Sequence, residues 1–193
     1  VIAILFWIPI ARRKQSSEFI TATTHAEEKR AVYRSPLTWA IVGFFGLQST
    51  GFYATLNWLP SLLVDRGLSE IDAGALLGLT TFVGVPTGFV TSLFIRKFKS
   101  LSLIAEGLTS FTLSGVLLIW LSPNLLVLGC LLTGFGFAAT FPLSLTLVGS
   151  RASTTSQTTQ LSALAQGCGY VIAAIGTFLF GEFWRLTGSW DAS

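Results

Sequence analysis

Long stretches without a charged side chain constrain this chain more than any other feature. Four such stretches run for 23 to 44 residues each, and about 20 apolar residues in an α-helix cross the roughly 30 Å hydrocarbon core of a membrane. Charged residues make up only 11% of the 193 residues, against about 25% in soluble domains. This composition excludes a soluble enzyme, a nucleic-acid-binding protein and a disordered tail, and predicts an all-α membrane protein. The uncharged stretches are residues 37–64, 73–95, 107–150 and 152–181.

The uncharged stretches divide into five predicted membrane spans. The longest, with 44 residues, is too long for one crossing, and the turn sequence Ser122-Pro123-Asn124 divides it. Residues 1–11 are also apolar, and the basic cluster Arg12-Arg13-Lys14 comes after them. A signal peptide carries its positive charge before the apolar run, so these residues do not form one. We therefore expect 1–11 to end an earlier span, 12–36 to form a polar loop, and the chain to be a fragment of a longer polypeptide. The bundle is expected over 37–193, with complete spans near 38–63, 72–95, 101–121, 125–149 and 157–181.

The basic residues lie mostly on one side of these predicted spans. Cytoplasmic loops of membrane proteins carry an excess of Lys and Arg. Placing residues 12–36 in the cytoplasm assigns ten basic residues to that side and two, Arg66 and Arg185, to the other. The positive net charge therefore reflects membrane topology, and no nucleic-acid partner is expected. The ten residues are Arg12, Arg13, Lys14, Lys29, Arg30, Arg34, Arg96, Lys97, Lys99 and Arg151.

Small residues recur at helical spacing in two of the predicted spans. Such residues allow neighbouring membrane helices to approach closely. Prolines inside a span remove a backbone hydrogen bond and can kink the helix. The expected contact faces are Gly74, Gly78, Thr81, Gly84 and Gly88 in one span and Gly169, Ala173 and Gly176 in another, and the prolines are Pro60, Pro86 and Pro142.

Neutral polar side chains follow one face of three predicted spans. Burying an unpaired amide in an apolar medium costs roughly 2–7 kcal/mol, so Asn57 and Gln166 are expected to face partners, water or a solute rather than lipid. Together with tyrosines and hydroxyl groups, they predict a shared polar cavity. For the individual Ser and Thr side chains we prefer the alternative, hydrogen bonding between helices. The candidate cavity residues are Tyr53, Asn57, Thr140, Ser144, Gln166 and Tyr170.

Glu106 is the single ionisable side chain inside a predicted span. An ionisable group at membrane depth is a candidate proton carrier. However, Glu106 lies about 9 Å from the expected inner end of its helix, at 1.5 Å per residue, and Lys97 and Lys99 are near enough to pair with it. We therefore favour a structural role and keep proton transfer as the alternative.

The residues that most catalytic and metal sites need are scarce. His25 is the single histidine and lies in the predicted cytoplasmic loop, while Cys130 and Cys168 lie in different spans. An intramembrane Ser–His pair or a His-ligated metal is therefore not available, and the cysteines are expected to be small packing residues. We expect no enzymatic activity, no metal and no cofactor.

A short basic motif ends the second complete span. Its residues are Gly88-x-x-x-Ser92-x-x-Ile95-Arg96-Lys97, which resembles the second copy of the cytoplasmic loop motif G-x-x-x-D-x-x-G-R-[RK] of the major facilitator superfamily. Gly88, Arg96 and Lys97 match the motif, whereas Ser92 and Ile95 replace its acid and its second glycine. The resemblance therefore implies a basic turn here, without the charge relay assigned to that acid.

Longer segments are similar to the bacterial cyanate and 2-nitroimidazole transporter family. The resemblance implies the C-terminal half of a 12-helix bundle, with helices seven to eleven, part of helix six, and the twelfth helix missing. In that fold helices seven, eight, ten and eleven line the central cavity and helix nine is peripheral. The similar segments are residues 51–69, 141–147, 165–170 and 186–190.

The resemblance also implies a function. By this resemblance we expect a secondary transporter of the bacterial inner membrane that moves a small solute by alternating access. The solute would be a cyanate-like anion or a nitroimidazole-like organic compound, and the expected partners are the lipid bilayer and the missing N-terminal half. The alternative is a membrane subunit with a structural or interaction role and no transport.

Overall fold

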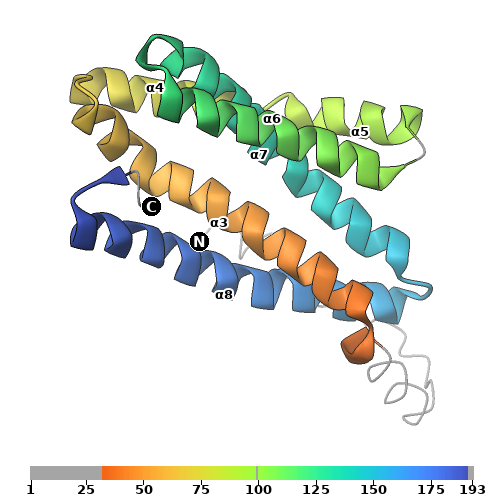
Figure 1. Cartoon of the computed structure of the whole chain (residues 1–193). Coiled ribbons are helices and arrows are strands. Elements are labelled where there is room, and N and C mark those ends of the chain that lie inside the picture. Colours follow the sequence, from red (N-terminus) through yellow and green to blue (C-terminus); the bar gives the residue numbers. More distant parts are fainter. Residues whose placement is uncertain (1–31, 99, 191–193) are drawn as a thin grey trace, which may run out of the picture.

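The computed structural model describes residues 32–98 and 100–190, and the elements in these residues are helices (Figure 1). The expected span end at 1–11, His25, Lys99 and most of the loop 12–36 lie outside the described residues. The helices are α3 (Pro36–Asp65), α4 (Glu70–Phe82), α5 (Thr87–Lys97), α6 (Leu101–Leu121), the 3-10 turn η1 (Pro123–Leu125), α7 (Leu126–Arg151) and α8 (Thr155–Thr187).

The helix ends follow from local capping chemistry. The Ser69 hydroxyl accepts a hydrogen bond from the backbone N–H of Asp72 at 3.1 Å, which satisfies one of the free donors at the start of α4. Thr154 caps α8 in the same way through the N–H of Gln157. The α8 helix ends at Gly188, whose φ of 65° lies in the left-handed region that glycine adopts without steric cost.

The span expected over 72–95 lies within the membrane-length stretch Glu70–Lys97, in which residues 83–86 form turns between α4 and α5. Pro86 has no backbone N–H to donate and restricts the residue before it, and Gly84 donates to the carbonyl of Thr81 in a turn. By contrast, Pro60 and Pro142 lie inside the continuous helices α3 and α7. The sequence predicted that these prolines could kink their helices, and the structure shows that the helix is interrupted at Pro86.

In the part of the chain that the structure describes, four helical stretches have the length and apolarity to cross a membrane. Helix α3 has 30 residues, about 45 Å at 1.5 Å per residue, but is not among the four because polar residues lower its mean hydropathy. Its crossing therefore remains an expectation from its uncharged sequence. The four stretches are Glu70–Lys97, Leu101–Leu121, Pro123–Arg151 and Thr155–Thr187.

Helix α3 packs along α8 and α6 packs along α7, while α7 also contacts α4 and α3 (Figure 1). Glycines make the two main contacts close. A Cβ atom on Gly169 would lie 2.6 Å from the Phe45 ring on α3, and one on Gly129 would lie 2.9 Å from the carbonyl oxygen of Gly115 on α6. The small residues expected on the 157–181 span therefore do permit close approach.

The small residues of the 72–95 span have a different role from the one expected. Only at Gly84 would a Cβ atom meet another helix, at 2.9 Å from the Cβ of Ala138. At Gly74, Gly78 and Gly88 no atom of the described residues lies within 4 Å of such a Cβ. This face of α4 and α5 is therefore open rather than a helix contact within the described bundle.

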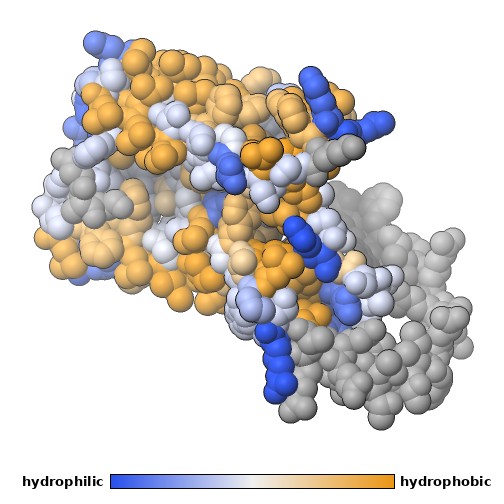
Figure 2. Space-filling view, turned by 45° about the vertical axis from the view of Figure 1, so that its right-hand side comes forward, coloured by the Kyte–Doolittle hydropathy of each residue, from blue (hydrophilic) through white to orange (hydrophobic). Residues whose placement is uncertain are grey.

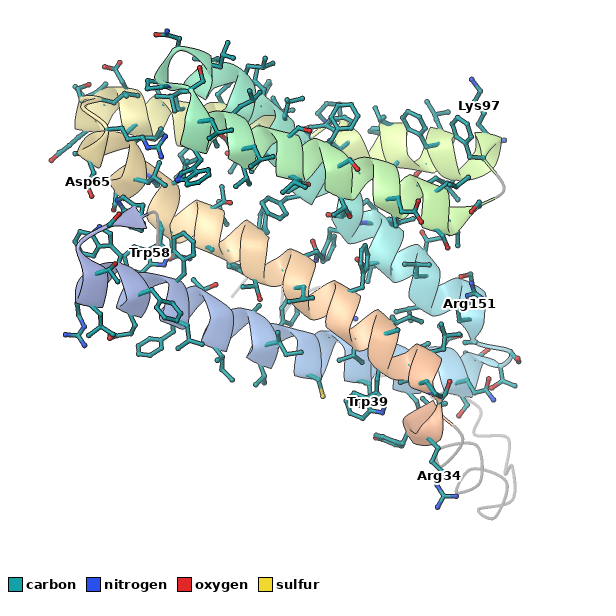
Figure 3. The ribbon with its side chains drawn as sticks, in the orientation of Figure 1. Arg34, Trp39, Trp58, Asp65, Lys97 and Arg151 are labelled. Atoms are coloured by element: carbon teal, nitrogen blue, oxygen red, sulfur yellow. The ribbon has the colours of Figure 1, made fainter. Side chains whose placement is uncertain are left out.

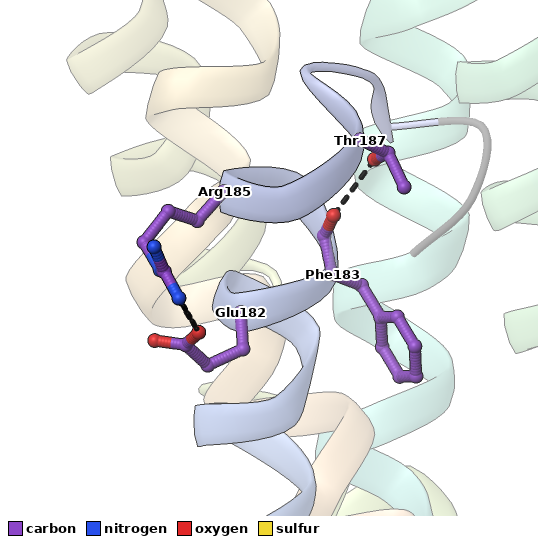
Figure 4. A network of polar contacts seen from close by, with 4 residues as sticks. All are labelled: Glu182, Phe183, Arg185 and Thr187. Atoms are coloured by element: carbon purple, nitrogen blue, oxygen red, sulfur yellow. Dashed lines mark hydrogen bonds and ion pairs between the residues drawn. The ribbon is translucent and has the colours of Figure 1, made fainter.

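The charged side chains separate toward the two ends of the bundle. Arg34, Lys97 and Arg151 lie at one end, which we call the basic end, and Asp65 lies at the other (Figure 3). At the end opposite the basic one, Arg185 forms an ion pair of 2.8 Å with Glu182 (Figure 4). Apolar side chains cover much of the visible face between the ends (Figure 2), as a lipid-exposed surface requires.

Candidate functional site

The structure brings three of the predicted cavity residues together in one cavity between α3 and α8, which we call the α3–α8 cavity. Its volume is about 470 Å³, within the range of roughly 300–1,000 Å³ found for ligand pockets. Tyr53 and Asn57 reach it from α3 and Tyr170 from α8. The full lining is Tyr53, Asn57, Trp58, Tyr170, Ala173, Ala174, Thr177 and Phe178.

Polar groups in the α3–α8 cavity keep hydrogen-bonding capacity. The Asn57 amide donates to the backbone carbonyl of Tyr53 at 2.7 Å, which uses one of its two N–H groups and leaves its carbonyl oxygen for another partner. The Thr177 hydroxyl is buried and has no hydrogen-bond partner among the described residues, while its backbone carbonyl accepts from the Trp58 indole at 3.1 Å. The cavity thus combines an accessible amide with the rings and hydroxyl groups of two exposed tyrosines, while the Thr177 hydroxyl lies buried beneath its wall.

An aromatic row connects this cavity with α7. The Tyr53 and Tyr170 rings lie 6.3 Å apart, Tyr170 lies 5.4 Å from Phe45, and Phe45 lies 6.0 Å from Phe141. Edge-to-face and tilted pairs at these separations attract one another beyond their buried area. Because Tyr53 and Tyr170 are each 39% exposed, their ring faces and hydroxyl groups can contact a solute.

A second cavity, which we call the α3–α4–α7 cavity, has a volume of about 440 Å³ and one amide, Gln48, in its lining. Gln48 is only 9% exposed and donates to the Ser49 hydroxyl at 2.8 Å. Phe52, Phe137 and Phe141 supply aromatic wall. This cavity is therefore largely apolar, with a single amide group at one side.

Sequence reasoning missed Gln48 and gave Thr177 no place among the six candidates. At 100° per residue, Gln48 lies about 200° from Thr50 on α3, so it falls outside the stripe that contains Thr50 and Tyr53. The desolvation argument that selected Asn57 applies equally to Gln48 and would have found it.

The remaining candidates lie apart from the α3–α8 cavity. Thr140 and Ser144 are buried on α7, where each hydroxyl donates to a carbonyl of its own helix, at 2.9 Å and 2.8 Å. Thr140 also approaches the Gln48 carbonyl oxygen at 3.5 Å. Gln166 is half-buried on α8 and is not part of the α3–α8 cavity lining. Both hydroxyl groups thus donate mainly within α7 itself, and the expected hydrogen bonding between helices is represented here by the 3.5 Å contact of Thr140 with Gln48.

Glu106 is exposed on α6 and belongs to neither cavity lining. Among the described residues, the ion pair found is Arg185–Glu182, so the expected pairing of Glu106 with Lys97 is absent there. The Lys97 ammonium instead lies 5.8 Å from the centre of the Phe98 ring.

The loop-motif residues lie at the end of α5. Arg96 and Lys97 occupy its last turn, where positive charge interacts favourably with the helix dipole. Ser92, which stands in the position of the motif's acid, donates to the Gly88 carbonyl at 2.8 Å. The motif thus forms a basic helix end, and its serine is satisfied within the helix.

Within residues 32–98 and 100–190 no cluster of three or more His, Cys, Asp or Glu side chains has the arrangement of a metal site. Cys130 and Cys168 are free thiols on α7 and α8.

Comparison with known proteins identifies the family. The model of the Major Facilitator Superfamily matches residues 1–177. The chain belongs to the major facilitator superfamily. It is 34% identical over 191 residues to the "2-nitroimidazole transporter" of Escherichia coli (strain K12), which covers 99% of this chain and 48% of that relative. No solved structure gives a significant match.

Two further relatives match over nearly the same residues. The "Uncharacterized transporter YycB" of Bacillus subtilis (strain 168) is 31% identical over 98% of this chain and 47% of the relative. The "Cyanate transport protein CynX" of Escherichia coli (strain K12) is 27% identical over 98% of this chain and 48% of the relative. The chain thus spans about half the length of these curated relatives, and its fold is consistent with the C-terminal half of a major facilitator bundle.

Proposed function

We propose that this chain forms half of the solute pathway of a secondary transporter for small, neutral, planar organic compounds of the nitroimidazole type. The observation that carries the proposal is the uncharged α3–α8 cavity, which is lined by the Asn57 amide and by the exposed aromatic rings of Tyr53 and Tyr170. Aromatic faces suit a flat ring, and an amide and a hydroxyl suit its polar substituents.

The two candidate solute cavities have no charged side chain in their lining, which favours a neutral solute over an anion. Neither the α3–α8 cavity nor the α3–α4–α7 cavity has a Lys, Arg, Asp or Glu side chain in its lining. An anion in a site of low dielectric needs a compensating cation, which this half does not offer in either cavity. The name of the 2-nitroimidazole transporter, which matches at 34% identity, agrees with the neutral alternative.

Membership of the major facilitator superfamily supports transport by alternating access. In this mechanism two bundles rock around a site near the middle of the membrane, so the α3–α8 cavity would face a second bundle from the same polypeptide. The basic end, with Arg34, Lys97 and Arg151, would lie in the cytoplasm because cytoplasmic loops are enriched in basic residues. The site would then be in the bacterial inner membrane, with residues 12–36 on the cytoplasmic side.

Direct flux measurements test the proposal. The complete polypeptide that carries this chain is reconstituted into proteoliposomes and supplied with labelled 2-nitroimidazole or labelled cyanate. We expect protein-dependent flux of 2-nitroimidazole and none of cyanate. Flux of cyanate alone would contradict the neutral-solute proposal, and no flux of either compound would contradict the assignment of this substrate class.

Variants then distinguish a transporter from a structural subunit. Asn57→Ala and Tyr170→Ala remove cavity groups and are expected to reduce 2-nitroimidazole flux while the protein remains folded. Ser110→Ala is the matched control, because Ser110 is exposed on α6 and bonds only to the carbonyl of Glu106 in its own helix. If Asn57→Ala changed thermal stability and left flux unchanged, a structural role would describe the residue better.

A further inference from the structure

A third hollow, which we call the α5–α6 groove, lies outside both candidate solute cavities. Its volume is about 700 Å³, and side chains from α5, α6 and α7 line it together with Val83. Its lining contains no polar or charged side chain. The residues are Val83, Phe94, Phe98, Leu103, Ile104, Gly107, Leu108, Phe111, Leu131, Leu132 and Phe135.

The shape of the groove follows from two local features. The end of α5 lies beside the start of α6 (Figure 1), and Phe94 and Phe98 stack there at 5.8 Å and form one wall. Gly107 leaves space in α6, since nothing lies within 4 Å of the position its Cβ would take. The groove is open to its surroundings, because Leu103 is 64% exposed and Phe111 is 49% exposed.

Positive charge lies at one end of this apolar groove. Arg96 and Lys97 occupy the last turn of α5 and are exposed, and Lys97 projects outward from the bundle (Figure 3). The Lys97 ammonium lies 5.8 Å from the centre of the ring of Phe98, which is itself part of the wall. The groove therefore has an apolar lining and, at the end of α5, two exposed cations, of which Lys97 lies beside the wall residue Phe98.

We propose that the α5–α6 groove binds an anionic phospholipid, with an acyl chain against its phenylalanine and leucine side chains and the phosphate at Arg96 and Lys97. Basic residues at the ends of membrane helices bind anionic lipid head groups. Charge complementarity therefore selects a lipid, and the site is independent of which solute is transported.

Native mass spectrometry of the complete, delipidated polypeptide tests this site. The protein is mixed with phosphatidylglycerol or with phosphatidylcholine carrying the same acyl chains. We expect the first bound phosphatidylglycerol to be retained about tenfold more strongly than phosphatidylcholine, from two basic contacts. Inorganic phosphate is not expected to displace it, because the acyl chain contributes to binding. Equal retention of both lipids would overturn the proposal.

Two variants locate the lipid. Replacing both Arg96→Gln and Lys97→Gln should reduce phosphatidylglycerol retention to that of phosphatidylcholine, and Gly107→Leu should reduce retention of both by filling the groove. The matched controls are Arg151→Gln, at the basic end but outside the groove lining, and Gly167→Leu, at an open glycine of α8. The proposal fails if the controls lose as much lipid as the groove variants, or if Gly107→Leu abolishes a protein dimer and leaves lipid retention unchanged.

Discussion

Gly169→Ala tests how closely α3 and α8 pack beside the candidate cavity. The new methyl group would lie 2.6 Å from Cδ1 of Phe45 and 3.3 Å from the backbone nitrogen of Gly46. Phe45 has no exposed surface and contacts Phe141 and Tyr170, so its ring has little room to move. Overpacking of this kind costs roughly 1–3 kcal/mol.

Gly167→Ala is the matched control on the same helix. Nothing lies within 4 Å of the Cβ that it would add, so it introduces no clash. Both substitutions replace a helical glycine by alanine, and their gain in helix propensity, about 1 kcal/mol in water, cancels when the variants are compared. The difference in unfolding free energy between the two variants should therefore equal the packing penalty, with Gly169→Ala the less stable.

The assay is thermal unfolding of the two variants in the same detergent. For a chain of this size 1 kcal/mol corresponds to about 2–4 °C in Tm, so Gly169→Ala should melt roughly 2–12 °C below Gly167→Ala. Equal melting temperatures would refute the close α3–α8 contact. Because Phe45 contacts the Tyr170 ring, the same substitution should also reduce solute flux.

Substitutions at three other positions have defined expectations. Glu106→Gln should leave solute flux unchanged across the pH range, because Glu106 lies outside both cavity linings; a lost pH dependence would restore the proton-carrier alternative. Ser69→Ala removes the α4 cap and should cost about 1 kcal/mol in unfolding free energy, whereas Ser69→Asn, which can accept from the Asp72 N–H and donate to the Asp72 carboxylate, should retain stability. Gln48→Leu should lower stability, because the buried Ser49 hydroxyl loses the hydrogen bond that it accepts from the Gln48 amide, and should alter flux only if a solute enters the α3–α4–α7 cavity.

Much of the helical architecture could be predicted from the sequence, because charged side chains are costly inside a membrane and the spans therefore stand out as long uncharged stretches. The division between α4 and α5 could not be predicted in the same way. Pro60, Pro86 and Pro142 all carry the same local signal, yet only Pro86 is preceded by a turn, and tertiary contacts decide which helix continues. The open face at Gly74 and Gly78 likewise depends on which neighbours are present, which small residues alone do not reveal.

The candidate site was harder to predict because residues on one helix face do not all reach one cavity. Tyr53, Asn57 and Tyr170 meet because α3 and α8 pack side by side. Thr140 bonds to carbonyls of its own helix instead, as short hydroxyl side chains commonly do in membranes. Gln48 was missed since it lies on another face of α3, and that face became relevant only once α4 and α7 were placed against it.

The central claim, that the α3–α8 cavity holds a neutral planar solute, is tested most directly by solute protection of a cysteine. In the complete polypeptide, with Cys130 and Cys168 replaced by alanine, Asn57→Cys is labelled with a maleimide in the presence of 2-nitroimidazole or cyanate, and Ser110→Cys serves as the control. The account predicts that 2-nitroimidazole slows labelling at position 57, that cyanate does not, and that labelling at position 110 is unchanged. Unchanged labelling at position 57 in a protein that still transports 2-nitroimidazole would contradict the account.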